Sequence, residues 1–408
     1  MKTTRAKPSH FTAVVGPLCG LIPLGMVTEQ ACAVGFRLPN QDPAGIARGN
    51  AFAATADNPS AIYYNPAGIT QLEGHNFDAG LYLISANTEY ESASGAKAKT
   101  DGTFQPVPQL HYVYSPKDSP FSFGLGVYAP YGLSLDWGNN PPFRTLAQEG
   151  KLLYACINPV VAWQIHPTLS IGIGPTLNYS EATLKRGIGI VAGDEFKFEG
   201  NGFAAGFNAG IRWQPHEKWA FGVNYRSSTE VEYDGKSSTT PSPPLAAATS
   251  TSGSVYFPQF VAAGVSFRPT EKWNFEFDVD WTDWDKVNKI VFEGTAFGNV
   301  PFVLNYESSF MYEFGITRQL PNGYYISTGY IYSENSSPDR NFNPIVPDSN
   351  LHLGSIGIGH KGGRWDWAAG YHFAYNGGRE VGNSVPGPAD GTYKTLNHAF
   401  NISVTLKF

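Results

Sequence analysis

The end of the chain constrains the fold most strongly, because residues 395–408 alternate between two kinds of side chain. One set is almost entirely apolar, and the other is small or polar. The apolar set is Leu396, His398, Phe400, Ile402, Val404, Leu406 and Phe408. A period of two residues is typical of a β-strand with two unlike faces. Shorter stretches near 169–173, 219–225, 273–281 and 367–375 repeat the alternation. The sequence therefore predicts an all-β protein.

Composition favours a membrane barrel over a soluble fold. Aromatic residues make up 14% of the chain and charged residues only 15%. After residue 33, no stretch is long and apolar enough for a membrane helix. This combination is typical of outer-membrane barrels, whose apolar outer band is flanked by aromatic side chains. A large soluble β-sandwich stays open on composition alone. The net charge of −6 and the lack of a basic stripe argue against nucleic-acid binding.

Short turns and long loops alternate along the chain, and together they predict the number of strands. The short turns, rich in proline and glycine, lie at 115–118, 166–168, 214–217, 268–271, 320–323 and 361–364. The long loops lie near 91–104, 131–150, 182–200, 234–253, 289–302, 334–349 and 376–394. These connections join fourteen antiparallel strands into a transmembrane barrel over residues 75–408. Short periplasmic turns and long external loops are the pattern of outer-membrane barrels.

The first 33 residues have the three parts of a secretory signal peptide. Basic residues come first, an apolar run follows over 11–27, and Ala31-Cys32-Ala33 resembles a cleavage site. A single membrane-anchoring helix is one alternative, although two prolines interrupt the run. A lipoprotein anchor at Cys32 is another.

Residues 34–74 do not alternate and are rich in alanine, glycine, asparagine and proline. The lumen of a fourteen-stranded barrel is too wide for its own side chains to fill. We therefore expect this segment to form an N-terminal hatch that plugs the lumen. The alternative is a periplasmic extension outside the barrel.

Several motifs resemble the FadL/TodX family of outer-membrane proteins. Tyr64-Asn65-Pro66-Ala67-Gly68 looks like the hatch of that family, and residues 128–133 and 157–163 are similar to its third and fourth strands. With the terminal Phe408, the resemblance covers most of the chain after residue 33. It implies uptake of long-chain fatty acids or aromatic hydrocarbons across the outer membrane of a Gram-negative bacterium. It also implies a gap in the wall at the third strand, with the hatch residues Asn65, Pro66 and Ala67 nearby.

Sideways release suits a hydrophobic cargo. Each methylene that leaves water gains about 0.8 kcal/mol, so release into the aqueous periplasm would be costly. A lateral exit requires broken strand pairing. Gly124 and Gly126 in the expected third strand are candidates for this kink, because glycine weakens strands and marks bulges. The alternative is that these two lumen-facing positions are small to make room for the hatch.

Ligand capture is expected in the external loop that follows the third strand. Its apolar candidates are Leu133, Leu135, Trp137 and Phe143. Exposed apolar patches of this kind usually bind something. Packing of the loop against itself is the alternative.

To bind the carboxylate headgroup of a fatty acid, the protein would need a cationic side chain. Arg226 faces inward by the alternation of its strand, and Arg144 and Lys151 flank the apolar loop. Each of them could instead pair with a neighbouring acid or with lipopolysaccharide. A row of acids, Glu276, Asp278 and Asp280, also faces inward and predicts a wet, polar lower lumen.

Other functions find less support. The sequence has no G-x-S-x-G or H-E-x-x-H motif, and Cys156 alone remains after signal removal, so we expect no enzyme, cofactor or metal. A general diffusion porin would have no hatch. The feature that favours an adhesin or a purely structural barrel is the Ser/Thr/Pro-rich loop 237–254. The expected partners are a hydrophobic ligand, outer-membrane lipid and lipopolysaccharide, and the barrel-assembly machinery acting on Phe408. We expect a monomer. The sequence leaves fatty acid and aromatic hydrocarbon open as ligands.

Overall fold

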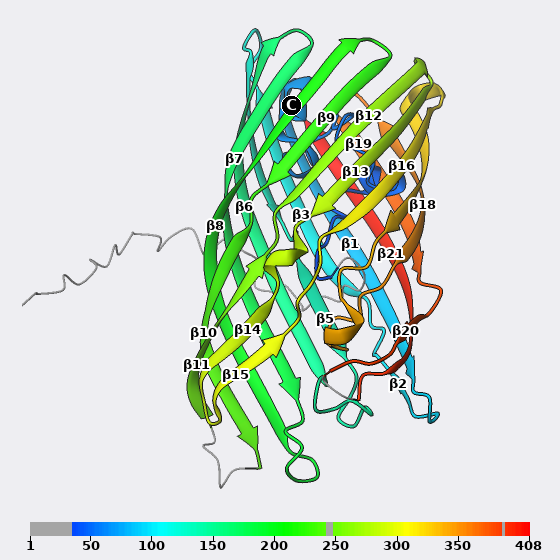
Figure 1. The fold of residues 1–408 in the computed structure, drawn as a ribbon. Helices are drawn as coiled ribbons and strands as arrows, with labels where there is room; N and C mark the ends of the chain where they lie inside the picture. The colour runs from blue at the N-terminus through cyan, green and yellow to red at the C-terminus, as the bar shows by residue number, and fades with distance from the viewer. Residues whose placement is uncertain (1–34, 242–247, 386–387) are drawn as a thin grey trace, which may run out of the picture.

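The computed structural model describes residues 35–241, 248–385 and 388–408. The predicted signal peptide lies outside the described residues, as does part of the loop 237–254. The protein is a closed antiparallel barrel of fourteen wall strands with a hatch in its lumen (Figure 1). Among the described residues, no helix has the length and apolarity needed to cross a bilayer.

The wall follows the predicted order of strands. Its strands are β1 (Gly74–Glu91), β3 (Gln105–Ser115), β4 (Phe121–Tyr128), β6 (Glu149–His166), β7 (Leu169–Arg186), β8 (Glu195–His216), β9 (Trp219–Arg226) continued by β10 (Thr229–Thr240), β11 (Ala248–Phe257) continued by β12 (Phe260–Thr270), β13 (Trp273–Thr282), β16 (Ser309–Gln319), β17 (Tyr324–Ser333), β18 (Leu351–Lys361), β19 (Trp365–Tyr375) and β21 (Gly391–Lys407). β1 pairs with β21 from Asn76↔Lys407 to Glu91↔Thr392, and this pairing closes the barrel.

The remaining elements lie in the hatch and in the connections. The hatch contains α1 (Pro43–Ala47), α2 (Ala61–Tyr64) and η2 (Pro66–Gln71), and the connections contain β2 (Lys97–Lys99), β5 (Gly132–Asp136), η3 (Trp284–Lys286), β14 (Lys289–Thr295), β15 (Gly298–Val303), η4 (Pro321–Gly323), η5 (Asp339–Asn341) and β20 (Arg379–Val381). The short turns gather at the end of the barrel that holds the C-terminus, and the long loops gather at the other end (Figure 1). The predicted alternation of short and long connections is therefore correct.

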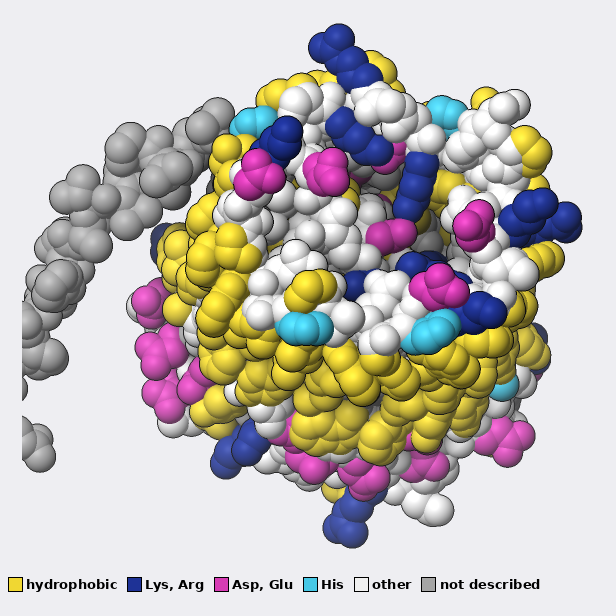
Figure 2. All heavy atoms as spheres, turned by 90° about the horizontal axis from the view of Figure 1, so that it is seen from above, with side chains coloured by type: hydrophobic (Ala, Val, Ile, Leu, Met, Phe, Trp, Pro, Cys, Tyr) yellow, Lys and Arg dark blue, Asp and Glu magenta, His cyan; other side chains and the backbone are white. Residues whose placement is uncertain are grey.

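The two faces of the wall are inverted relative to a soluble protein. In β21, Phe400 and Ile402 are half exposed, while Asn397 and Asn401 are buried against the lumen. Seen from the end with the short turns, apolar side chains form a belt around the outside (Figure 2). Exposed tryptophans lie beside the short turns at Trp163, Trp213, Trp219 and Trp367. An apolar belt bordered by aromatic residues matches the hydrocarbon layer and its interface.

The hatch fills the lumen and touches opposite sides of the wall. α1 lies against β18 and β19, and η2 lies against β6, β7 and β8. The Asp42 side chain caps α1 by accepting hydrogen bonds from the amides of Ala44 and Gly45. Nearly all hatch residues are buried. β1 begins at Gly74, directly after this segment.

Glycines in the wall let the hatch backbone approach closely. A Cβ atom on Gly222 would lie 2.0 Å from the carbonyl oxygen of Ala53, and one on Gly329 would lie 2.0 Å from the amide nitrogen of Gly49. Such distances leave no space for a side chain. The hatch and the wall are thus in direct backbone contact at several strands, which fixes the hatch's position.

Candidate functional site

The wall is broken next to β4. This strand pairs with β3 from Tyr114↔Phe123 to Leu110↔Val127, and with β6 along its whole length. After Tyr128 the chain turns into the lumen, and β5 then pairs with β6 only. The stretch 105–109 of β3 pairs with β1 but has no wall strand on its other side in the described part of the chain.

The predicted kink was placed at the wrong residues. Pairing is continuous through Gly124 and Gly126 on both sides, so neither glycine breaks the wall. A Cβ atom on Gly124 would lie 2.9 Å from the Ile62 side chain, and one on Gly126 would lie 3.0 Å from it. Both glycines therefore make room for the hatch, which was the alternative reading. The break lies a few residues later, after Tyr128.

The first described residues of the hatch lie across this break. The Leu38 amide donates to the carbonyl of Pro130 at 2.8 Å, and the Gly132 amide donates to the carbonyl of Phe36 at 2.9 Å. On the other side, Gln109 Nε2 donates to the carbonyl of Asn40 at 2.9 Å. The hatch therefore contacts both sides of the break, at residues 130–132 through backbone and at Gln109 through its lumen-facing side chain.

The edge of the break is apolar and poor in hydrogen-bond donors. Val107 and Ala129 are buried in one cluster with Ile46, Tyr82 and Ile84. Pro106 and Pro108 of β3 have no N–H group to offer a pairing strand. At these positions the edge is therefore suited to apolar contact.

The motif Asn65-Pro66-Ala67 lies away from the break. Asn65 Nδ2 donates to the carbonyls of Ala53 and Ile211 at 2.7 and 3.0 Å, and its Oδ1 accepts from the Ala67 amide at 3.1 Å. A Cβ atom on Gly172 of β7 would lie 2.5 Å from the carbonyl carbon of Pro66. The motif therefore locks the hatch onto β7 and β8, on the β6 side of β4.

Carboxylates of β13 hold the hatch. Asp278 Oδ2 accepts from the amides of Phe52 and Ala53 at 2.8 Å, and Glu276 Oε1 accepts from the amides of Ala54 and Thr55 at 2.8 and 3.0 Å. These acids are buried and bound to backbone. The row of acids therefore binds hatch amides and not water, whereas the predicted polar lower lumen is lined by other residues.

Two arginines of the hatch complete this attachment. Arg37 pairs with Asp280 through two contacts of 2.7 Å, and Arg48 lies 3.2 Å from Glu276. All four side chains are buried. Removing one partner of a buried pair leaves an uncompensated charge, so the hatch is strongly fixed on the β13 side.

An apolar pocket of about 100 Å³ lies toward the long loops. Its wall comes from β6, β7, β8, β10 and β11, and the hairpin β14–β15 and residues 345–346 cover it. The side chains that shape it include Phe36, Leu133, Phe198, Phe292, Phe302 and Ile345. Among the described residues that line it, Lys151 is the only charged one. Because Lys151 is paired with Glu149, the cavity is in effect apolar, which suits a hydrocarbon chain or an aromatic ring.

The predicted capture loop is not exposed. Leu133, Leu135, Trp137 and Phe143 are all buried. Phe143 packs edge-on to Trp137 and Tyr90, and Trp137 Nε1 donates to the carbonyl of Pro344 at 2.8 Å. The expectation of an exposed patch is wrong, because distant loops cover these side chains. Leu133 alone reaches the pocket.

The three candidate cations have different surroundings. Lys151 lies at the pocket and pairs with Glu149. Arg144 pairs with Asp194 at 3.0 Å and so joins two external loops. Asp194 also accepts from four successive amides, from Ile188 to Val191. Burial raises the pKa of this carboxyl, but those amides and Arg144 outweigh it, so the pKa is lowered.

Arg226 is buried without an acid. One of its terminal nitrogens donates to the Tyr128 hydroxyl, and the other lies 3.8 Å from the sulfur of Cys156. Its guanidinium carbon lies 5.3 Å from the ring centres of both Tyr63 and Tyr128. In the described residues no carboxylate lies within ion-pair distance of it, and its Nε has no hydrogen-bond acceptor. A fully buried arginine without a paired acid is unusual in a folded protein.

The comparisons with known proteins agree with this geometry. Residues 24–376 match the model of the family described as outer membrane protein transport protein (OMPP1/FadL/TodX). The chain belongs to this family. The long-chain fatty acid transport protein of Escherichia coli K12 is 21% identical over 386 residues, covering 82% of this chain and 86% of that protein.

Solved FadL/TodX structures share the fold. A FadL homologue from Pseudomonas aeruginosa superposes with a TM-score of 0.81 at 16% identity, covering 92% of this chain and all of that one. The toluene transporter TodX of Pseudomonas putida superposes with a TM-score of 0.72 at 16% identity, covering 93% and 100%. The protein is thus an outer-membrane transporter of hydrophobic compounds in a Gram-negative bacterium.

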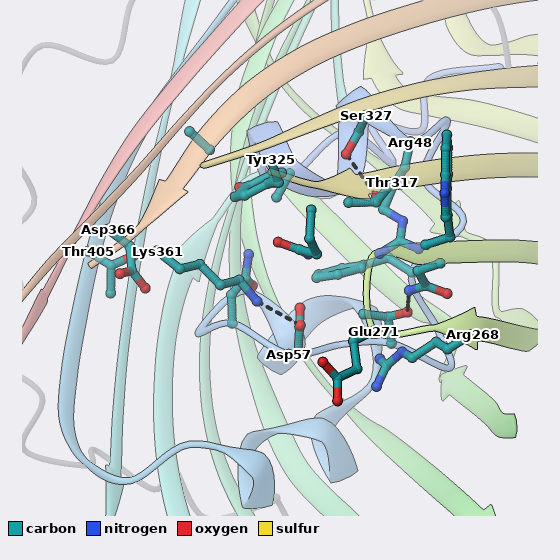
Figure 3. Close-up of a pocket in the computed structure, with 18 of the residues that line it drawn as sticks. Arg48, Asp57, Arg268, Glu271, Thr317, Tyr325, Ser327, Lys361, Asp366 and Thr405 are labelled. Carbon is teal, nitrogen blue, oxygen red and sulfur yellow. Dashed lines mark hydrogen bonds and ion pairs between the residues drawn. The ribbon is translucent and has the colours of Figure 1, made fainter. Parts of the chain in front are cut away.

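In this FadL/TodX barrel, a second cavity opens at the end with the short turns. It measures about 620 Å³ and is lined by charged, polar and aromatic side chains from the hatch, the short turns and wall strands between β12 and β21 (Figure 3). Lys361 bridges to Asp57 of the hatch at 2.8 Å. Burial raises the pKa of Asp57, but Lys361, Arg268 and Arg48 outweigh it and lower the pKa to about 2. The charged side chains make this cavity suitable for water and ions.

The hairpin that covers the apolar pocket was not predicted from the sequence. Residues 289–302 were predicted as an external loop, yet they form β14 and β15 and place Phe292 and Phe302 over the pocket. The apolar residues Ile290, Phe292, Phe302 and Leu304 in an otherwise polar loop were the available signal.

Proposed function

We propose that this FadL/TodX protein takes up long-chain fatty acids. The acyl chain enters the apolar pocket, crosses the lumen, and leaves sideways through the break beside β4. The observation that carries the proposal is the apolar pocket, whose lining matches a hydrocarbon chain. Lys151, which is paired with Glu149 at the edge of the pocket, would have to exchange this partner for the carboxylate of the ligand.

Energetics favour a sideways exit. A chain of roughly a dozen methylenes gains on the order of 10 kcal/mol on leaving water. That gain would be lost in the polar cavity at the periplasmic end. The break has the apolar edge residues Val107 and Ala129, and we propose that it opens toward the hydrocarbon layer. A chain that leaves there never returns to water.

Arg226 is the proposed inner contact for the carboxylate. It lies beside Tyr128, the last residue before the break. A carboxylate there would supply the counter-charge that the described residues do not provide. The headgroup would then pass from Lys151 at the pocket to Arg226 at the exit.

A second candidate function is uptake of aromatic hydrocarbons. A cavity of roughly 150 Å³ with an apolar lining is known to hold benzene. The pocket of about 100 Å³ is closer to one aromatic ring than to a full acyl chain. A fatty acid would therefore need the cover residues, such as Phe292, to move apart.

We also propose that the protein transports its ligand without catalysing a reaction, and we propose its partners in the outer membrane. We expect lipopolysaccharide around the outer rim and a monomeric barrel. The exposed Phe408 stacks on His75 at 5.1 Å between ring centres, and we propose that the barrel-assembly machinery recognises it.

The test is uptake of labelled oleate, toluene and a small sugar by cells that lack their own FadL-type proteins. Cells expressing the wild type should take up oleate. Lys151→Gln should reduce oleate uptake severalfold and leave toluene uptake unchanged. Lys97→Gln removes an exposed external lysine and serves as the control. Uptake of toluene alone would favour the second candidate, and free passage of the sugar alone would refute both.

A further inference from the structure

A small polar cavity lies between the hatch and the wall, on the β13 side of the lumen. It measures about 20 Å³, which is room for one particle the size of a water molecule. The hatch contributes Tyr63 to its lining, and the wall contributes Asn224 of β9, Asp278 of β13 and Glu313 of β16. None of the wall residues has a part in the proposed fatty-acid route.

Two carboxylates meet at this cavity. Asp278 and Glu313 are directly opposite each other on β13 and β16, and both are buried in the lumen, with 1% and 3% of their surface exposed. The Cβ atoms of such cross-strand partners lie about 4.5–5.5 Å apart, and like charges at this spacing are destabilising. Because burial also removes water from both charges, the pair is costly unless a positive charge lies beside it.

The residues that the structure describes do not supply that charge. Asp278 Oδ2 accepts from two hatch amides, but its Oδ1 has no hydrogen-bond partner. Glu313 makes no hydrogen bond or ion pair within the described part of the chain. Arg37 also lines the cavity, but it is already paired with Asp280. The two carboxylates at the cavity are therefore left with unused oxygen atoms.

A neutral oxygen completes the set. Asn224 is buried, and its Nδ2 donates to the carbonyl of Tyr63 at 3.0 Å. This hydrogen bond fixes the orientation of the amide, and it leaves Oδ1 as the end without a partner among the described residues. Carboxylate and amide oxygens, without nitrogen or sulfur ligands, are the donors that hard metal cations prefer.

We propose that this cavity binds one monovalent metal cation, and that Na⁺ is the ion that fits it. Asp278, Glu313 and Asn224 are its ligands, and they come from three different wall strands. The ion offsets the repulsion between the two carboxylates. Since Asp278 also holds the hatch amides, an ion at this place stabilises the attachment of the hatch to β13.

Two observations favour one positive charge over two. In the described ranges, no three or more His, Cys, Asp or Glu side chains are grouped so that they could hold a metal ion, whereas Ca²⁺ usually takes about six to eight oxygen ligands. The guanidinium group of Arg37 lines the same cavity and repels further positive charge. The size of the cavity favours Na⁺ without its water shell over the larger K⁺.

The test measures ion binding and thermal unfolding of the full-length barrel, purified in detergent at about pH 8, where carboxyl groups in water are ionised. Chlorides of Na⁺, K⁺ and choline are compared at equal ionic strength, so that screening stays constant. Choline is too large for the cavity. The wild type should bind about one radioactive Na⁺ per barrel and should unfold several degrees higher in Na⁺ than in choline, with a smaller shift in K⁺.

Glu313→Gln removes one ligand and one of the two like charges. It should abolish saturable Na⁺ binding and give the same unfolding temperature in all three salts. In choline it should be at least as stable as the wild type, because the repulsion is gone. Glu313→Asp keeps the charge on a shorter side chain and should weaken Na⁺ binding without abolishing it. The control is Glu307→Gln, which changes an exposed glutamate just before β16 and should leave Na⁺ binding as in the wild type.

Three results would overturn the proposal. If the wild type unfolds at the same temperature in all salts and shows no saturable Na⁺ binding, the two carboxylates share a proton or the cavity holds water. Na⁺ binding that survives Glu313→Gln would place the ion elsewhere in the protein. Displacement of Na⁺ by lower concentrations of Ca²⁺ would refute the assignment to a monovalent cation.

Discussion

Arg37 of the hatch and Asp280 of β13 form a buried ion pair in which each terminal nitrogen of the arginine lies 2.7 Å from a carboxylate oxygen. The same arginine donates to Thr282 at 2.8 Å and lies 3.6 Å from the ring centre of Phe260. One hatch side chain is thus bound to β13 next to the residues that lie across the break. The hatch is fixed on one side and faces the opening on the other.

Breaking that pair should loosen the hatch. Asp280→Asn leaves Arg37 buried without a counter-charge, which costs about 3–5 kcal/mol. We expect a lower unfolding temperature of the purified barrel and increased entry of a small hydrophilic antibiotic into cells. Lys361→Ala breaks the half-exposed pair with Asp57 and should cost only about 0–1 kcal/mol. Equal effects of the two substitutions would contradict the buried attachment.

Two wall glycines offer a matched test of the close approach of hatch and wall. Gly329→Ala places a Cβ atom 2.0 Å from the Gly49 amide nitrogen, and we expect destabilisation of about 1–3 kcal/mol. Gly354→Ala has no atom within 4 Å of its new Cβ and should be nearly neutral. Thermal unfolding of both variants measures the difference. A neutral Gly329→Ala would show that the hatch does not sit as closely as described.

Arg226 should contribute to the binding of oleate and not to the stability of the ligand-free barrel. Arg226→Gln removes a buried cation without a counter-charge, so the unfolding temperature without ligand should be unchanged or higher. Oleate binding should weaken by about 1.5–3 kcal/mol through loss of a charge-assisted hydrogen bond. Binding of toluene should not change. Titration calorimetry with both ligands separates these effects, and unchanged oleate binding would remove Arg226 from the route.

The cover of the pocket should decide which ligands enter. Phe292→Ala enlarges the apolar pocket under β14 and should favour longer acyl chains over single rings. Uptake of fatty acids of increasing chain length, compared with toluene, measures this preference. The control Phe297→Ala changes an exposed residue of the same hairpin that does not line the pocket. A shift of the same size in both variants would show that the pocket does not select the ligand.

Much of the fold could be predicted because the barrel wall follows a local rule. The alternation near residues 395–408 and the proline- and glycine-rich turns depend only on neighbours in the sequence. The inward direction of Arg226 and of Glu276, Asp278 and Asp280 followed from the same alternation. All four side chains are buried in the lumen.

The contacts of the loops and the hatch could not be predicted in that way. Trp137 is buried because its indole meets Pro344, more than two hundred residues away, so the alternation says nothing about it. The acids of β13 bind hatch amides instead of water, since their partners come from another part of the chain. The break follows Tyr128 and not the glycines, because the chain there ends its pairing with β3 and bonds instead to the hatch backbone.

The most direct test of the account is to map the route with a photoreactive oleate. The ligand carries a diazirine near the end of its chain, is bound to the purified protein and is then cross-linked by light. Mass spectrometry should find labels near Leu133 and Phe292 in the pocket and near Val107 and Ala129 at the break. Labels on Trp273 and Tyr325 in the periplasmic cavity, with none at the break, would contradict sideways release.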